Sequence, residues 1–145
     1  MTIKKIYNKK VITAFYDTSI YEIAKLMKKY NVGDIVIVNK EGKNIPVGII
    51  TDRDIIIKLI ADEIDLKEIS ASDIMNSDLL LLTEQSGILE GLDMVSARGT
   101  RRAPVVDFSG ELVGIVTADD FTVLIADEME SYAKLVRKQL AGNHL

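Results

Sequence analysis

The sequence of 145 residues contains no cysteine, no tryptophan and one histidine, His144, near its end. Without cysteine the chain has no disulfide framework, no thiolate metal site and no thiol nucleophile. A single histidine leaves little from which to build a catalytic triad or a multi-histidine metal site. We therefore expect a protein that is not an enzyme and has no metal site, and a disordered tail around His144.

Long apolar runs are also missing. No run approaches the roughly 18 residues of a membrane span, and the N-terminus lacks the apolar core of a signal peptide. This favours a soluble, cytoplasmic protein that contacts no membrane. The net charge of −4 makes nucleic acid an unlikely partner, because binding to phosphate backbones needs a basic surface.

What the sequence does contain is an internal repeat. The loop glycines Gly42 and Gly110 are 68 residues apart, as are Asn8 and Asn76, whereas the later pair Gly48 and Gly114 is 66 apart. The first copy thus has two extra residues in a hairpin. Two units of this size would each be marginal alone, so we expect them to share one core.

Apolar spacing and turn residues predict a β-α-β-β-α order for each copy, and hence an α/β (α+β) fold. The predicted strands are 11–14, 34–38 and 47–50 in the first copy, and 79–82, 103–106 and 112–116 in the second. Asp17, Thr18 and Ser19 offer caps for the first helix of the first copy, and Ser86 for that of the second. Thr51 and Thr117 are expected to cap the second helix of each copy. We divide the chain into 1–68, with a connector at 62–72 that has helical character near 66–69; 69–126; and a helical extension, 127–145.

Each copy contains the element Gly-apolar-apolar-Thr-x-x-Asp, at 48–54 and at 114–120. One interpretation is structural: the threonine caps a helix and the aspartate suits the helix dipole. The other is a nucleoside pocket, in which the aspartate accepts hydrogen bonds from ribose and the helix start holds phosphate. The repeated register favours the second interpretation, as does a glycine where a side chain would block close approach to the strand.

These elements resemble a tandem pair of CBS domains, a Bateman module, over nearly all of residues 3–126. Ser72-Asp73-Ile74-Met75 and Arg101-Arg102-Ala103-Pro104-Val105-Val106-Asp107 also fit that family. The resemblance implies two repeats packed through their sheets about a pseudo-two-fold axis. It also implies clefts between them that bind AMP, ADP, ATP or S-adenosylmethionine, and a homodimer.

By position, the resemblance assigns ribose to the two aspartates and ribose or phosphate to the two threonines. It assigns the base to backbone near the first strand of each copy, and phosphate to the arginines. The ligand-binding residues predicted in this way are Thr117, Asp120, Arg101, Arg102, Thr51, Asp54, Arg53, Thr13, Leu81, Ala103 and Pro104.

The two copies differ where the arginines stand, because Arg101 and Arg102 correspond to Gly33 and Asp34 in the first copy. An aspartate would repel phosphate there. We therefore expect one well-formed site from Asp120, Thr117, Arg101 and Arg102, and a weaker one around Asp54 and Thr51. The alternative is that the arginines are solvated loop charges.

The leading hypothesis is a regulatory sensor module that needs no cofactor. It would bind an adenosine-containing ligand, AMP, ADP or ATP, and pass a conformational signal to an unidentified protein partner. The alternatives are a ligand-free dimerisation or interaction module and an S-adenosylmethionine binder. A hard-cation site at Asp119, Asp120, Asp127 and Glu128 is disfavoured, because acids at a helix start suit the dipole.

Overall fold

The computed structural model describes residues 1–142 and contains two β-α-β-β-α repeats, as predicted. The tail around His144 lies outside the described residues. The first repeat comprises β1 (Thr13–Phe15), α1 (Ile20–Tyr30), β2 (Asp34–Val38), β3 (Pro46–Thr51) and α2 (Asp52–Ile55), which continues as the π-helix η2 (Ile56–Ile60). The second comprises β4 (Leu82–Thr83), α4 (Ile88–Arg98), β5 (Arg102–Val106), β6 (Leu112–Thr117) and α5 (Ala118–Gly142). The short helices η1 (Ile3–Lys5) and α3 (Ala71–Ile74) precede the two repeats.

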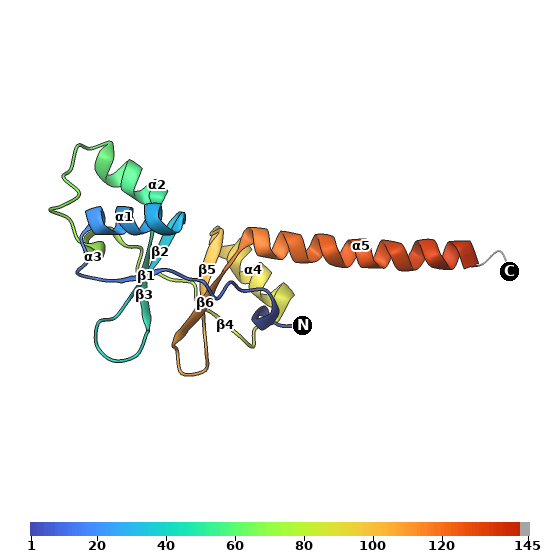
Figure 1. Ribbon diagram of the computed structural model, residues 1–145. Helices are drawn as coiled ribbons and strands as arrows, with labels where there is room; N and C mark the ends of the chain where they lie inside the picture. The colour runs from blue at the N-terminus through green and yellow to red at the C-terminus, as the bar shows by residue number, and fades with distance from the viewer. Residues whose placement is uncertain (143–145) are drawn as a thin grey trace.

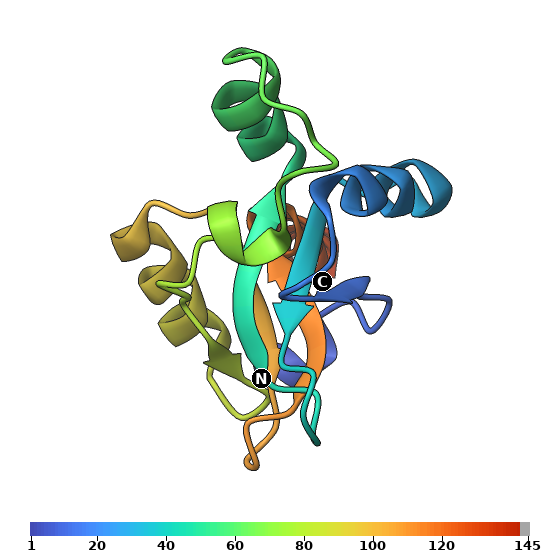
Figure 2. The ribbon, with the colours of Figure 1, turned by 90° about the vertical axis from the view of Figure 1, so that its left-hand side faces the viewer.

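Each repeat forms a three-stranded sheet, ordered β1-β2-β3 and β4-β5-β6. The first strand runs parallel to the second, and the second and third form an antiparallel hairpin. The sheets pack against each other through Val36 and Val38 of β2 and Leu112 and Ile115 of β6 (Figures 1 and 2). The predicted packing of the repeats through their sheets is confirmed.

The helix ends follow the sequence signals in most places. Ser19 caps α1 by accepting a hydrogen bond from the Glu22 amide at 3.2 Å. In the second repeat the N-cap of α4 is Gly87, and the prediction of Ser86 is wrong. The Ser86 hydroxyl instead accepts from the Thr83 amide at 3.2 Å, because it closes the turn before the helix.

The core is divided, and the expectation of one shared core is wrong. Each repeat has its own buried aliphatic cluster, and a smaller third cluster lies where the sheets meet. The short helices are exchanged between the clusters. Ile3 is fully buried in the cluster of the second repeat, and Ala71 in that of the first. Each repeat is therefore completed by the segment that leads into the other one.

Backbone pairing fixes this exchange. Asn8 and Ile115 exchange two backbone hydrogen bonds, at 2.8 and 3.0 Å, and Asn76 and Ile49 do the same at 3.1 and 3.0 Å. At Asn8 and Asn76 the chain still pairs with a strand of the other repeat, so the first strand of its own sheet begins only after this crossing. The first strands begin at Thr13 and at Leu82, after the predicted starts at 11 and 79.

The remaining differences lie outside the sheets. The stretch 66–69 is part of a turn rather than a helix, with the Glu68 amide donating to the Asp65 carbonyl at 3.1 Å. Helix α5 continues to Gly142, as its apolar spacing predicts. Its second half runs away from both repeats (Figure 1). Within residues 1–142, no helix combines the length and the apolar character that a membrane crossing requires.

Candidate functional site

The Thr-x-x-Asp element forms a reciprocal cap in both repeats. The Asp54 amide donates to the Thr51 hydroxyl and the Thr51 amide donates to Asp54 Oδ2, both at 3.1 Å. In the second repeat the Asp120 amide donates to the Thr117 hydroxyl at 3.3 Å, and the Thr117 amide donates to Asp120 Oδ2 at 2.8 Å. The structural interpretation of the element is thus confirmed. One oxygen of each carboxylate is occupied by the cap, and Asp54 Oδ1 lies 3.6 Å from Lys58 Nζ.

At the two strand glycines, Gly48 and Gly114, another segment of the chain packs closely against the strand. A Cβ atom at Gly48 would collide with the Met75 side chain. A Cβ atom at Gly114 would collide with the Tyr7 ring and with the Asn8 carbonyl. The close approach that these glycines predicted is present, but the segments that cross between the repeats make it, so the glycines are not evidence for a ligand.

A cleft of about 870 Å³ lies beside the start of α2. It is bounded by three parts of the chain: the end of β3 with α2, the crossing segment 75–80, and the end of α4 with the start of β5. Both repeats therefore contribute to it. Its apolar lining consists of Ile49, Met75, Leu79, Leu80 and Pro104. Such a surface can accept a flat base.

The polar lining of the cleft carries an excess of positive charge. Its basic residues are Arg53, Lys58, Arg98, Arg101 and Arg102, and its acidic residues are Asp52, Asp54 and Asp78. Five positive and three negative side chains give a local balance of +2 in a chain whose net charge is −4. Arginine suits phosphate because its fork of N–H groups can bind two oxygens at once.

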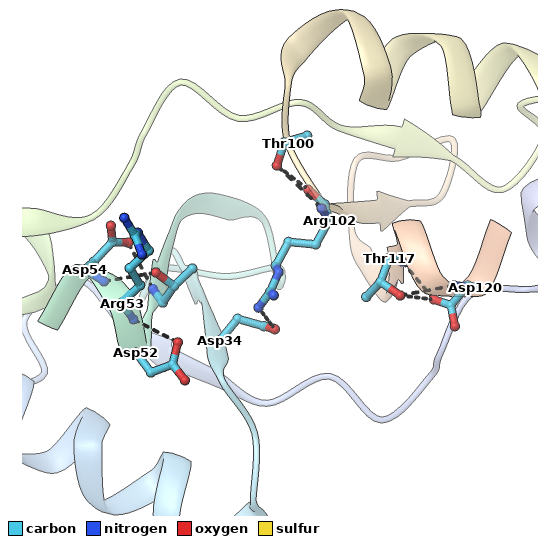
Figure 3. A network of polar contacts seen from close by, with 9 residues as sticks. Asp34, Asp52, Arg53, Asp54, Thr100, Arg102, Thr117 and Asp120 are labelled. Atoms are coloured by element: carbon cyan, nitrogen blue, oxygen red, sulfur yellow. Dashed lines mark hydrogen bonds and ion pairs between the residues drawn. The ribbon is translucent and has the colours of Figure 1, made fainter. Parts of the chain in front are cut away.

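Carboxylates hold the arginines in this structure. Arg102 Nη1 forms an ion pair with Asp34 of the other repeat (Figure 3). Arg101 lies 3.3 Å from the exposed Asp119, and Arg98 lies 3.4 Å from Asp78. The pairs of Arg101 and Arg98 are exposed, and exposed ion pairs contribute only about 0–1 kcal/mol to stability.

The pKa of Asp34, the partner of Arg102, is shifted from its ordinary value. Burial raises the pKa of its carboxyl, the charge of Asp52 raises it further, and Arg102 opposes both effects. The net direction is upward, so the arginine offsets only part of the cost of keeping this carboxylate charged inside the protein.

The structure brings six of the predicted residues together in the lining: Thr51, Arg53, Asp54, Arg101, Arg102 and Pro104. The lining does not include Thr13, Leu81, Ala103, Thr117 or Asp120. Ala103 is fully buried in the core of the second repeat. This cleft contains the arginines without Thr117 and Asp120, and a shared site of those four residues stays a prediction. The arginines face the motif of the first repeat, and Figure 3 shows Thr117 and Asp120 as a separate pair.

The sequence analysis did not predict Lys58, Arg98 or the crossing segment 75–80 as parts of the site. The signal that could have found them is the exchange between repeats, because a crossing segment brings the second repeat to the motif of the first. The strand register places Arg102 beside Thr117 of its own repeat, which on its own would indicate a local site within the second repeat.

The residues equivalent to this lining in the other half of the molecule carry different charges. At the offsets of 66 and 68, Asp119 stands for Arg53, Asp34 for Arg102, and Leu124 for Lys58. The charged residues of the equivalent set are Lys9, Lys10, Asp34, Asp119 and Asp120, a balance of −1. The two halves therefore differ in their suitability for an anion. Among residues 1–142, no three acidic or histidine side chains are grouped so as to hold a metal ion.

Comparisons with known proteins agree with this architecture. The sequence model of the CBS domain family matches this chain twice, at residues 3–61 and 71–127. The uncharacterized protein MK0525 of Methanopyrus kandleri is 35% identical over 120 residues, which are 83% of this chain and 60% of that protein. The chain thus spans less than two thirds of that relative.

Two solved structures share the fold. The CBS domain pair of protein MJ0100, solved in complex with 5′-methylthioadenosine and S-adenosyl-L-methionine, is 32% identical. That match covers 88% of this chain and 98% of that one, with a TM-score of 0.76. The CBS domain protein PAE2072 of Pyrobaculum aerophilum, complexed with AMP, is 23% identical, with coverages of 83% and 89% and a TM-score of 0.75. At that identity the likeness concerns the fold alone.

Proposed function

The chain belongs to the CBS domain family, as two repeats in tandem, and from this premise we propose that it is a regulatory module whose cleft binds an adenine nucleotide. The observation that carries the proposal is the cleft itself, whose lining combines five basic side chains with five apolar residues. AMP, ADP and ATP combine a flat base, a ribose and phosphate, and the lining offers a matching surface for each part.

Asp54 and Thr51 are proposed to hold the ribose. Asp54 Oδ2 is committed to the helix cap, whereas Oδ1 faces Lys58 at the edge of the cleft. Oδ1 would accept hydrogen bonds from the ribose hydroxyls. The Thr51 hydroxyl accepts from the Asp54 amide, and a hydroxyl can donate to a ligand oxygen at the same time.

Arg101 and Arg102 are proposed to bind phosphate, with Arg53, Lys58 and Arg98 close enough to hold further charge. This positive balance favours nucleotides over S-adenosylmethionine, whose sulfonium is itself positive. The ligands bound to the pair of MJ0100 keep S-adenosylmethionine as the second candidate.

The proposed signal is the release of the Arg102 guanidinium from Asp34 when it binds a phosphate. In the structure described here Arg102 holds Asp34 of the other repeat. A phosphate in the cleft would compete for the same guanidinium and loosen that link. A ligand that binds one arrangement of the repeats more tightly shifts the population toward it. A regulated protein partner would read that shift.

Thermal unfolding with adenosine, AMP, ADP, ATP and S-adenosylmethionine tests the proposal. A ligand at about 100 times its Kd adds about 2.7 kcal/mol to the stability of the native state. We expect the nucleotides to raise Tm more than adenosine does. A response to S-adenosylmethionine alone would favour the second candidate. A response to none of them would contradict the proposal and favour an interaction module.

A further inference from the structure

Helix α5 carries an apolar stripe that nothing in the described chain covers. Ile125, Met129, Tyr132, Val136 and Leu140 follow one another at intervals of four, three, four and four residues, so they share one face. Met129 is 63% exposed and Tyr132 is 64% exposed. The stripe continues into the second half of α5, which runs away from both repeats (Figure 1).

The stripe runs into an apolar groove at the base of the helix. The groove has a volume of about 270 Å³ and is lined by Met1, Ile88, Leu89, Leu124, Ile125, Glu128 and Met129. Glu128 is its one charged residue, and Leu89 beside it is 71% exposed. Stripe and groove together form one apolar surface along a protruding helix, larger than scattered exposed residues would make.

The charges along α5 indicate what covers this surface. The stretch 126–131 contains Asp127, Glu128 and Glu130, and the stretch 132–142 contains Lys134, Arg137 and Lys138. The helix dipole does not account for this order, because its effect is confined to the first and last turns and Glu130 and Lys134 lie mid-helix. An acidic half followed by a basic half is complementary to a copy of itself that runs in the opposite direction.

We propose that α5 pairs with α5 of a second copy of this chain, antiparallel, through this stripe. In that arrangement Tyr132 lies near the two-fold axis and the partner's Leu140 reaches the groove beside Ile125. Burial of the stripe supplies the affinity, and the charges choose the direction, since a parallel pair would place like charges side by side. This inference goes beyond the proposed function and does not depend on any ligand.

The oligomeric state provides the first test. We expect the chain to be a dimer by light scattering and Tyr132→Glu to be a monomer, with about a hundredfold or greater weakening of association. Val123→Glu is the matched control. Val123 is 60% exposed on the same helix, but it lies nine residues, about two and a half turns, from Tyr132 and so on the opposite face. A monomeric wild type, or a Tyr132→Glu variant that stays dimeric, would overturn the proposal.

Cysteine cross-linking tests the direction, because the chain has no cysteine of its own. Ile125→Cys and Leu140→Cys lie at opposite ends of the stripe, about 22 Å apart along the helix. An equal mixture of the two variants is expected to form a disulfide-linked heterodimer on mild oxidation, and neither variant is expected to cross-link with itself. Self-cross-linking of each variant would show a parallel pair and overturn the proposal, and so would the absence of any cross-link.

Discussion

Asp34 and Arg102 stand at equivalent positions in the two repeats and form an ion pair with each other across the boundary between them (Figure 3). The offset of 68 residues relates them, yet one is acidic and the other basic. The pair joins the repeats, and it also holds an arginine that lines the candidate cleft. Ligand binding and the contact between repeats therefore depend on the same guanidinium.

Replacing Asp34 is expected to release Arg102 for phosphate. Asp34→Asn removes the competing carboxylate and a negative charge near the cleft. We expect AMP to bind roughly three to ten times more tightly, as the loss of one partly buried ion pair implies. Isothermal titration measures the change.

Asp119→Asn is the matched control for that change, because Asp119 holds Arg101 in a pair that is far more exposed. We expect it to change the affinity less than Asp34→Asn does, since exposed ion pairs contribute about 0–1 kcal/mol, at most about fivefold in affinity. If Asp34→Asn weakened the binding of AMP, the exchange of partners by Arg102 would be disproved.

The raised pKa of Asp34 predicts a specific dependence of stability on pH. Below the ordinary pKa of aspartate the carboxyl is protonated in both the folded and the unfolded chain. As the pH rises through the raised pKa, the folded chain must charge a partly buried group, so the contribution of Asp34 to stability is lost. The free energy of unfolding of Asp34→Asn, minus that of the wild type, should increase over this range. Urea unfolding between about pH 3 and about pH 7 measures it.

Asp17 offers a control of opposite sign. A hydrogen bond from Lys40 holds the pKa of Asp17 below its ordinary value. Its contribution to stability is therefore present above the ordinary pKa and lost as the pH falls through the lowered one. The free energy of unfolding of Asp17→Asn, minus that of the wild type, should therefore decrease as the pH rises. Slopes of the same sign for both variants would contradict the assignment.

The exchange of segments between the repeats predicts that a residue preceding the first repeat is important for the stability of the second. Chain ends usually tolerate change, but Ile3 is fully buried in the core of the second repeat. We expect Ile3→Ala to cost about 2–4 kcal/mol, the range for a buried aliphatic side chain. Ile57→Ala, at a site that is 50% exposed, should cost under about 1 kcal/mol. Equal losses in chemical denaturation would show that the segment is not part of that core.

Local patterns predicted the elements of this fold well. Apolar alternation, caps and turn glycines gave the order of strands and helices, and the repeat of Gly48 and Gly114 gave two equivalent units. These signals act over a few residues, where steric and hydrogen-bonding preferences decide the backbone. They carry no information on how the repeats face each other, so the three separate cores were not predicted.

Six of the predicted site residues line the cleft, but the cleft combines the arginines with the motif of the first repeat rather than with that of the second. Arg101 and Arg102 were expected beside the motif of their own repeat, because the family resemblance assigns phosphate to them by their position in the second copy. Their place in the cleft depends on the packing between repeats, where Asn76 pairs with Ile49 and carries the crossing segment past the first motif. That contact joins residues far apart in the sequence, and a pattern within one repeat does not encode it.

The measurement that tests the central claim most directly is the titration of AMP into Asp54→Asn and Asp120→Asn. An asparagine oxygen can still accept from the threonine amide, so both variants keep their helix caps, and equal shifts in Tm would show it. Loss of one charged hydrogen bond predicts at least about tenfold weaker binding for Asp54→Asn. Binding within about twofold of the wild type is expected for Asp120→Asn, which lies outside the cleft lining. Equal weakening in both variants, or a greater loss in Asp120→Asn, would contradict the account.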